Sequence, residues 1–107
     1  MTTKKYAFEE YEITLSKTSE SISIQLLDTT LYKLYTGLYD DVKVTDYCQN
    51  IDIFYTVLDT SFNAWVSSDT EKAKVHIRKN STNIILHINH TFYVIFEFDL
   101  VLQLDTT

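Results

Sequence analysis

The three histidines, His76, His87 and His90, are the side chains whose chemistry first suggests a metal site or an acid–base pair. A hairpin with its turn at Asn80 and Ser81 would place His76 beside Ile85 and His87 beside Lys74, so the two histidines would share one face. A zinc site needs three or four converging ligands, supported by carboxylates behind them. Because no acidic residue is expected beside either histidine, we predict exposed strand histidines, a turn position for His90, and no metal site.

Cys48 and the acidic residues are the remaining candidates for catalysis. Cys48 lies near the expected start of a helix, whose dipole lowers the pKa of a thiol, but no histidine is close in sequence to activate it. The carboxylates cluster only at residues 9–12 and at Asp40 and Asp41. The sequence indicates no cleft that would separate two carboxyl pKa values, and residues 40–44 lack the glycine and alternating oxygens of a calcium loop. We predict a protein without catalytic residues, cofactor or metal, and keep an enzyme that uses a histidine or Cys48 as a third alternative.

The composition argues against several functional classes. The 107 residues include one glycine, Gly37, and no proline, whereas phosphate-binding loops and nucleophile elbows need glycine. A net charge of −6 argues against a protein that binds polyanions. Eight Tyr, six Phe and one Trp could stack on bases, but cations and aromatics interleave closely only at Tyr32, Lys33 and Tyr35. We therefore predict no nucleic-acid partner, and a single cysteine excludes an internal disulfide.

The chain is expected to form one domain over residues 1–107, with a flexible arm at 1–6 and a flexible tail at 105–107. Its first residues are basic, but three glutamates interrupt the apolar stretch that a secretory signal requires. The longest apolar run, residues 91–96, is too short to span a bilayer. We expect a cytoplasmic protein with no membrane span, in which the two Asn-X-Thr sequences are turns.

Alternating apolar residues predict strands through the first third of the chain. A turn at Thr18 and Ser19 places every apolar residue on one face; the expected pairs are Leu15 with Ile22, Ile13 with Ile24, and Tyr11 with Leu26. A third strand, over residues 31–38, follows a polar turn at residues 28–30 and is expected to place Tyr32 and Leu34 beside the second strand.

The apolar spacing then changes to that of a helix over residues 44–66. One stripe recurs at intervals of three, four and seven residues: Tyr47, Ile51, Phe54, Leu58 and Trp65. Thr45 is the expected N-cap, with Asp46 in the first turn. Because the β-branched residues here form helices poorly, we expect this helix to need a sheet to pack against.

Three more strands are predicted after the helix, over residues 72–79, 83–88 and 92–104. A turn at Asn80 and Ser81 pairs Ile77 with Ile84 and Val75 with Leu86. The sequence therefore predicts an α+β fold with an antiparallel β3-α-β3 layout, in which two three-stranded meanders pack with one long amphipathic helix.

The last predicted strand, over residues 92–104, is unusual in two respects. It would be about 44 Å long, more than twice the usual length. In its first half both faces are apolar, because Tyr93 and Ile95 lie opposite the apolar row of Phe92 and Val94, whereas a sheet with one solvated face should alternate. Either a closed barrel buries Tyr93 and Ile95, or this segment contacts another chain.

The layout resembles small, glycine-poor β-helix-β proteins of large nucleocytoplasmic DNA viruses. The resemblance is carried by five segments: residues 11–13, residues 22–30, Thr45 with Asp46 at the start of the helix, residues 83–88, and residues 96–98. It implies a viral or virion-associated structural protein and transfers no functional residues.

These observations predict a non-enzymatic structural or protein-interaction module that binds a protein partner or self-associates, as a homo-oligomer, through its C-terminal strand. The expected interface residues are Phe92, Tyr93, Val94, Ile95 and Val101. The alternative is a small binding domain that holds an apolar ligand inside a barrel.

Overall fold

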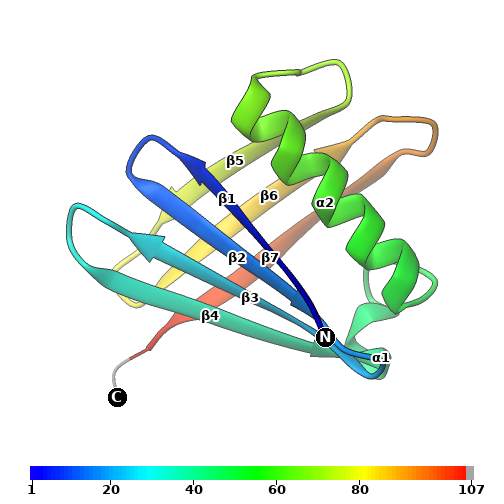
Figure 1. The fold of residues 1–107 in the computed structure, drawn as a ribbon, viewed down its shortest axis with the longest axis horizontal. Coiled ribbons are helices and arrows are strands. Elements are labelled where there is room, and N and C mark those ends of the chain that lie inside the picture. Colours follow the sequence, from blue (N-terminus) through cyan, green and yellow to red (C-terminus); the bar gives the residue numbers. More distant parts are fainter. Residues whose placement is uncertain (106–107) are drawn as a thin grey trace.

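A computed structural model describes residues 1–105 as one seven-stranded antiparallel sheet with a helical segment inserted after the fourth strand (Figure 1). The strand order in the sheet is β1-β2-β3-β4-β7-β6-β5. The strands are β1 (Thr2–Phe8), β2 (Tyr11–Lys17), β3 (Ser21–Asp28), β4 (Lys33–Asp40), β5 (Ala73–Lys79), β6 (Asn83–His90) and β7 (Phe96–Leu104). The helices are α1 (Asp41–Val44) and α2 (Ile51–Ser67).

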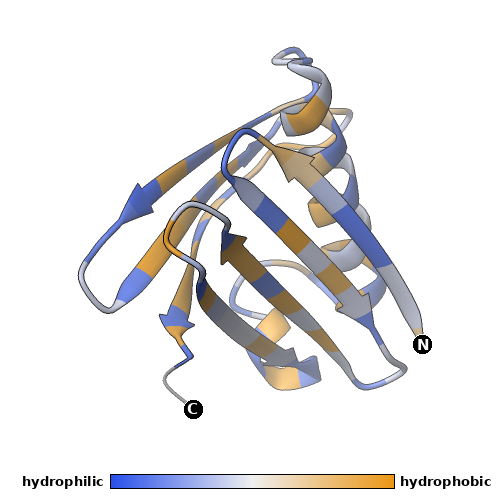
Figure 2. Ribbon diagram, turned by 60° about the vertical axis from the view of Figure 1, so that its left-hand side comes forward, coloured by the Kyte–Doolittle hydropathy of each residue, from blue (hydrophilic) through white to orange (hydrophobic). Residues whose placement is uncertain are grey.

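The sheet is strongly curled around α2, which makes the fold a half-barrel. Strands β4 and β7 share only two paired positions, Tyr35 with Leu104 and Thr36 with Gln103. The sheet therefore splays into two arms, β1–β4 and β5–β7, and α2 crosses the opening between them (Figure 1). Hydrophobic and hydrophilic residues alternate along the strands, so the apolar side chains gather on the inner face (Figure 2).

Helix α2 supplies the centre of the core. Its N-cap is Asn50, whose side chain accepts a hydrogen bond from the backbone N–H of Ile53, and it ends at Ser68 in the left-handed conformation. Phe54, Leu58 and Phe62 are fully buried against the inner face of the sheet. The predicted stripe is correct at Phe54 and Leu58, and burial of this face stabilises a sequence that forms helices poorly on its own.

The helix does not begin where the sequence predicted. In the range 44–66, expected to form one helix, Val44 is the last residue of the single turn α1, residues 45–50 form a connecting loop, and α2 begins only at Ile51. Asp40 caps α1 by accepting a hydrogen bond from the backbone N–H of Lys43 at 2.8 Å, and Asn50 caps α2. Thr45, the predicted N-cap, follows the C-terminus of α1 instead. Two good capping residues ten positions apart thus divide the segment.

The predicted β3-α-β3 layout is wrong, because the structure is mostly antiparallel sheet with seven strands rather than a balanced α+β arrangement. The additional strand is β1, formed by the segment expected to be a flexible arm at residues 1–6. Only Tyr6 is buried in β1, so this edge strand carries almost no apolar alternation that could reveal it. Its remaining polar residues suit an edge exposed to water. Residues 106–107 of the predicted tail lie outside the described residues.

Both predicted hairpins exist, but each turn lies one residue later in the chain than expected. Strand β2 pairs Leu15 with Ile24, and β5 pairs Ile77 with Leu86. The third predicted strand begins later than expected, at Lys33, and Tyr32 lies in the turn before it with a φ of 53°. Moving a turn by one residue shifts the pairing by two, which leaves every side chain on its predicted face.

The long C-terminal strand predicted over residues 92–104 is also wrong. Strand β7 begins at Phe96, and residues 91–95 form the loop that joins it to β6. Within β7 the predicted alternation is confirmed, since Leu100 and Leu102 are buried while Glu97 and Asp99 are exposed. Within residues 1–105, no helix is long and apolar enough to cross a membrane.

Candidate protein-interaction surface

The β6–β7 loop, residues 91–95, presents apolar side chains to solvent at one end of the half-barrel. Tyr93 is 92% exposed and Ile95 75% exposed, Val94 is about half exposed, and Phe92 is partly exposed. Of the two alternatives left open by the sequence, the one in which a closed barrel buries Tyr93 and Ile95 is therefore wrong. Large apolar side chains gathered on one loop are typical of a surface that binds another molecule.

The loop is held in a strained conformation. Tyr93 has a φ of 65°, a region that a bulky residue rarely adopts. The backbone N–H of Val94 donates to the carbonyl oxygen of Phe92 at 2.8 Å, which makes Tyr93 the central residue of a γ-turn with positive φ. Such turns cost about 1–3 kcal/mol and persist where surrounding contacts enforce them. Strain of this kind clusters at functional sites.

Contacts on both sides fix the loop to the sheet. His90, the last residue of β6, is buried, and its Nδ1 lies 2.8 Å from the carbonyl oxygen of Val94. The backbone N–H of Thr91 donates to the carbonyl oxygen of Lys72, and the ammonium of Lys72 lies 5.0 Å from the ring centre of Phe92. The loop therefore presents Tyr93 in a defined position.

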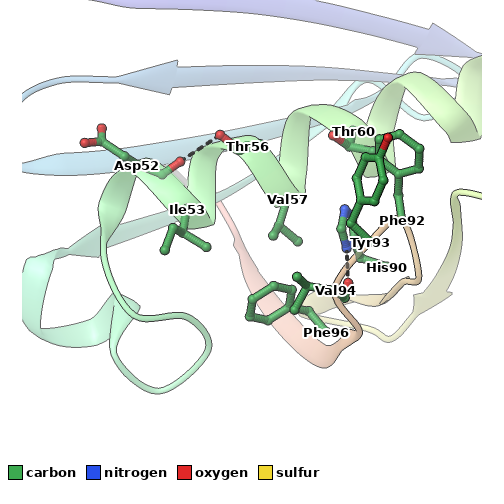
Figure 3. A pocket seen from close by; sticks show the side chains of 10 residues that line it. All are labelled: Asp52, Ile53, Thr56, Val57, Thr60, His90, Phe92, Tyr93, Val94 and Phe96. Carbon is green, nitrogen blue, oxygen red and sulfur yellow. Dashed lines mark hydrogen bonds between the residues drawn. The ribbon is translucent and has the colours of Figure 1, made fainter.

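An apolar pocket of about 370 Å³ lies between this loop and the N-terminal half of α2 (Figure 3). Ile53 and Val57 project from α2 toward the side where Val94 and Phe96 lie (Figure 3). The lining is apolar except for a few groups: Asp52, Thr56, Thr60, His90 and the phenol of Tyr93. Few polar groups at the rim of an apolar hollow are typical of pockets that bind an amphipathic group.

The α2 side of this pocket is the part that sequence reasoning missed. Ile53 and Val57 lie four residues apart, beside the main stripe of the helix, and this spacing is the signal that could have indicated a second apolar face. Asp52 carries the charge at this rim, and Lys17 of β2 lies 3.0 Å from its carboxylate. The structure thus brings together a helix face and a loop that are about 40 positions apart in the chain.

Of the five predicted interface residues, the loop brings four together and leaves out Val101. Phe92, Tyr93 and Val94 line the pocket, and Ile95 follows them in the same loop. Val101 lies within β7 and is 42% exposed, on the outer face of the sheet with Ile85 paired beside it. It therefore lies on a different face of the protein from the pocket.

His76 and His87 are strand residues on one face of a hairpin, as predicted, but their neighbours and the place of His90 differ from the prediction. His76 pairs with His87 across β5 and β6, and His87 pairs with Asp99 of β7. The ring nitrogens of His87 lie 2.6 Å from a carboxylate oxygen of Asp99 and 3.2 Å from one of Glu97. The expectation that no acidic residue lies beside these histidines is wrong, because it considered only the β5–β6 hairpin, whereas Asp99 and Glu97 belong to β7 on the other side of β6. His90, expected in a turn, is a buried strand residue.

The environment of His87 favours its protonated form. The hydrogen bond to Asp99 is the main cause of its raised pKa, with Glu97 adding to the effect. His76 and Arg78 of β5 line the same shallow hollow as His87 and Asp99. Within the described range, no three His, Cys, Asp or Glu side chains are grouped so that they could hold a metal ion.

Cys48 lies in the loop between the two helices and is buried. Burial raises the pKa of its thiol to about 11, so the thiol is almost entirely protonated near neutral pH. A thiol is a poor nucleophile in that form. The position suits a packing role better than covalent chemistry.

No model of a known protein family matches the sequence, and no curated protein matches it. The fold, however, is similar to the crystal structure of the head domain of human CCDC61, with a TM-score of 0.77. The similarity covers 98% of this chain and 100% of that chain, at 10% sequence identity. At this identity the likeness shows the fold, and it carries over no residue of the surface described above.

Proposed function

We propose that this chain is a non-enzymatic protein-interaction domain that associates with a second copy of itself through the β6–β7 loop and the adjoining pocket. The observation that carries the proposal is the position of Tyr93, which is almost fully exposed at the rim of an apolar pocket. A folded chain gains nothing by presenting an aromatic ring to water in a strained turn, whereas a binding surface gains a rigid anchor.

The arrangement of the surface favours a second copy of the chain as the occupant of the pocket. The loop supplies both the exposed side chains and one wall of the pocket, and α2 supplies the other wall. A two-fold dimer requires one patch that is complementary to itself. Because Tyr93 and the pocket lie on the same patch, a two-fold axis beside the loop would place the Tyr93 of each copy at the pocket of the other.

The chemistry of tyrosine suits this pocket. Ile53, Val57 and Phe96 offer apolar surface to the ring. The hydroxyls of Thr56 and Thr60 and the carboxylate of Asp52 are at the rim, where they can accept a hydrogen bond from a phenol. A tyrosine gains from such a site because its ring is apolar and its hydroxyl keeps a polar partner.

The alternative of an apolar ligand held inside a barrel has no cavity to support it within the described residues. The interior of the half-barrel is filled by α2 and fully buried side chains, among them Phe54, Phe62 and Leu86. The hollows of about 370 and 420 Å³ are open grooves at the surface. A virion-associated role stays a prediction of the sequence resemblance.

The double variant Tyr93→Ser/Ile95→Ser tests the proposal. Both side chains are exposed, so the variant should stay folded, with the circular dichroism spectrum of the wild type, while losing self-association in analytical ultracentrifugation. Tyr32→Ser is the matched control, because Tyr32 is 84% exposed and has a φ of 53° in a different turn. The proposal is wrong if the double variant associates as the wild type does. It is also wrong if the double variant unfolds and the conservative variant Tyr93→Phe/Ile95→Val does not associate.

A further inference from the structure

Strand β5 is an open edge of the sheet, and its backbone groups are available for pairing. Among residues 1–105, β5 pairs only with β6. The pairs Lys72 with Thr91 and Asn80 with Asn83, at the two ends of this ladder, are joined by backbone hydrogen bonds. Since bonded positions alternate in an antiparallel ladder, the N–H and C=O groups of Ala73, Val75 and Ile77 are directed away from β6.

A groove of about 420 Å³ runs beside this open edge. It is bordered by the C-terminal half of α2, the end of β1 and the first half of β5. Its apolar lining is made by Phe8, Ala64, Trp65, Ala73 and Val75, and the rings of Phe8 and Trp65 are in contact. The titratable residues of the lining are Lys74 and His76. Among residues 1–105, no carboxylate borders the groove.

The edge strand is basic although the protein is acidic. The net charge is −6, yet Lys72, Lys74, Arg78 and Lys79 supply four of the nine Lys and Arg residues. Lys79 is paired with Asp28, and Lys72 lies near Asp69. No ion pair within the described range involves Lys74 or Arg78, which are exposed on the outer face of β5 together with His76.

We propose that the β5 edge binds an extended acidic segment of a partner protein, which adds to the sheet as an eighth strand. This inference concerns a surface separate from the β6–β7 loop and stands whether or not the chain self-associates. The backbone groups of Val75 and Ile77 hold the segment by strand addition, whereas Ala73, which is 2% exposed, is covered at the start of the strand. Alternate side chains of the segment then point to opposite faces, apolar ones into the groove beside Trp65 and acidic ones toward Lys74 and Arg78.

Charge also decides against a second copy as the occupant. Pairing two β5 edges would bring the Lys74 and Arg78 side chains of both copies onto one face of a continuous sheet. Like charges directly opposed across a sheet are destabilising, and edge lysines are a common means of preventing such pairing. An acidic strand removes this repulsion and replaces it with attraction.

Trp65 provides a direct readout, because it is the only tryptophan in the chain and lies in the groove. The probe is an acetylated and amidated nine-residue peptide in which valine alternates with aspartate. We expect saturable binding that changes Trp65 fluorescence and weakens as salt is added. Two control peptides should bind roughly tenfold more weakly or worse. One has lysine in place of aspartate, and the other has the same composition with the valines and the aspartates grouped.

Strand addition makes a second prediction that charge attraction alone does not. In an added strand, alternate N–H groups of the peptide face β5. Two further peptides carry methyl groups on the backbone nitrogens, one at every valine and the other at every aspartate. One of these peptides should therefore lose binding, and the other should bind nearly as the parent does. If both methylated peptides bind like the parent, the segment does not add as a strand and the proposal is wrong.

Variants of the protein complete the test. Lys74→Glu should weaken binding of the aspartate peptide by roughly tenfold or more, whereas the charge-matched control Lys33→Glu, in the exposed start of β4, should leave it unchanged. The loop variant Tyr93→Ser/Ile95→Ser should bind the peptide as the wild type does, which separates this surface from the self-association site. Absence of saturable binding to the aspartate peptide, or equal losses in Lys74→Glu and Lys33→Glu, would overturn the proposal.

Discussion

The Nδ1 atom of His90 lies 2.8 Å from the carbonyl oxygen of Val94, which ties the last residue of β6 to the loop that carries the exposed apolar side chains. His90 is buried, so this contact is protected from water. It links the packing of the sheet to the conformation of the β6–β7 loop and, through that loop, to the proposed self-association surface.

Replacing His90 should therefore impair the surface more than the fold. In His90→Leu an apolar side chain fills the buried position but the bond to Val94 is lost, so the loop loses a constraint on its strained turn. We expect the free energy of unfolding to fall by about 1 kcal/mol in urea titrations. Self-association should weaken in sedimentation equilibrium, and an unchanged dissociation constant would show that the loop does not need this bond.

Asp28 forms the most buried ion pair of the described residues. Its side chain is fully buried and bonds to Lys79 of β5 and to the backbone N–H groups of Thr30 and Leu31. It therefore joins β3 to the β5 edge of the half-barrel. Asp28→Ala should lower the free energy of unfolding by about 3 kcal/mol, because it leaves an ammonium and two N–H groups without their partner.

The same pair predicts how stability changes in acid. The hydrogen bond from Lys79 is the main cause of the lowered pKa of Asp28 in the folded state. Its stabilisation is therefore present above the unfolded carboxyl pKa of about 3.9 and is lost as the pH falls through the lowered folded value. In urea titrations, the free energy of unfolding should fall less from pH 6 to pH 2 in Asp28→Asn than in the wild type. An identical fall in both would show that other carboxylates cause it.

His87 should act in the opposite direction. Asp99 and Glu97 raise its pKa in the folded state, so its stabilisation is complete below the unfolded value of about 6.5 and is lost as the pH rises through the raised value. Because all three side chains are exposed, the effect should be about 0.2–1 kcal/mol. The melting temperature of the wild type should include a part that falls between pH 5.5 and pH 8.5 and is absent in His87→Gln. If His87→Gln shows the same fall, another group causes it.

Gly37 is required by space rather than by backbone conformation. A Cβ atom at this position of β4 would lie 2.7 Å from Cδ2 of Leu102 and 2.8 Å from the hydroxyl oxygen of Tyr39. Gly37→Ala should therefore lower the free energy of unfolding by about 1–3 kcal/mol through overpacking. In urea titrations, the double variant Gly37→Ala/Leu102→Val should recover part of the lost free energy of unfolding. Equal free energies for the single and the double variant would mean that Leu102 is not the obstacle.

The faces of the strands could be predicted from the sequence, but their pairing could not. Alternation assigned Ile13, Leu15, Ile24 and Leu86 to the core correctly, since burial depends on which face a residue occupies. Pairing depends on turn geometry, and a turn moved by one residue shifts the pairing by two without moving any side chain to the other face. The two-residue error in β5–β6 placed Lys74 instead of His76 beside His87, whereas Asp99 lies beside His87 through the pairing of β6 with β7, for which the sequence predicted no register.

The candidate site was recognised from its loop and missed on its helix side. The run of apolar residues from Phe92 to Ile95 violates alternation, and this indicated a contact surface. Continuous apolar character could not show that the chain turns at Tyr93, because the turn uses a positive φ without glycine or asparagine. The meeting of this loop with Ile53 and Val57 is a property of the tertiary fold, which no local pattern specifies.

The solution mass of the wild-type chain, measured by light scattering on a sizing column over a hundredfold range of concentration, shows whether the chain self-associates. Self-association through the β6–β7 loop predicts a mass that rises from 12.5 kDa toward twice that value, and a rise abolished by Thr56→Arg, which fills the exposed rim of the pocket. A mass of 12.5 kDa throughout the range, or a dimer unaffected by both Thr56→Arg and Tyr93→Ser/Ile95→Ser, would contradict it.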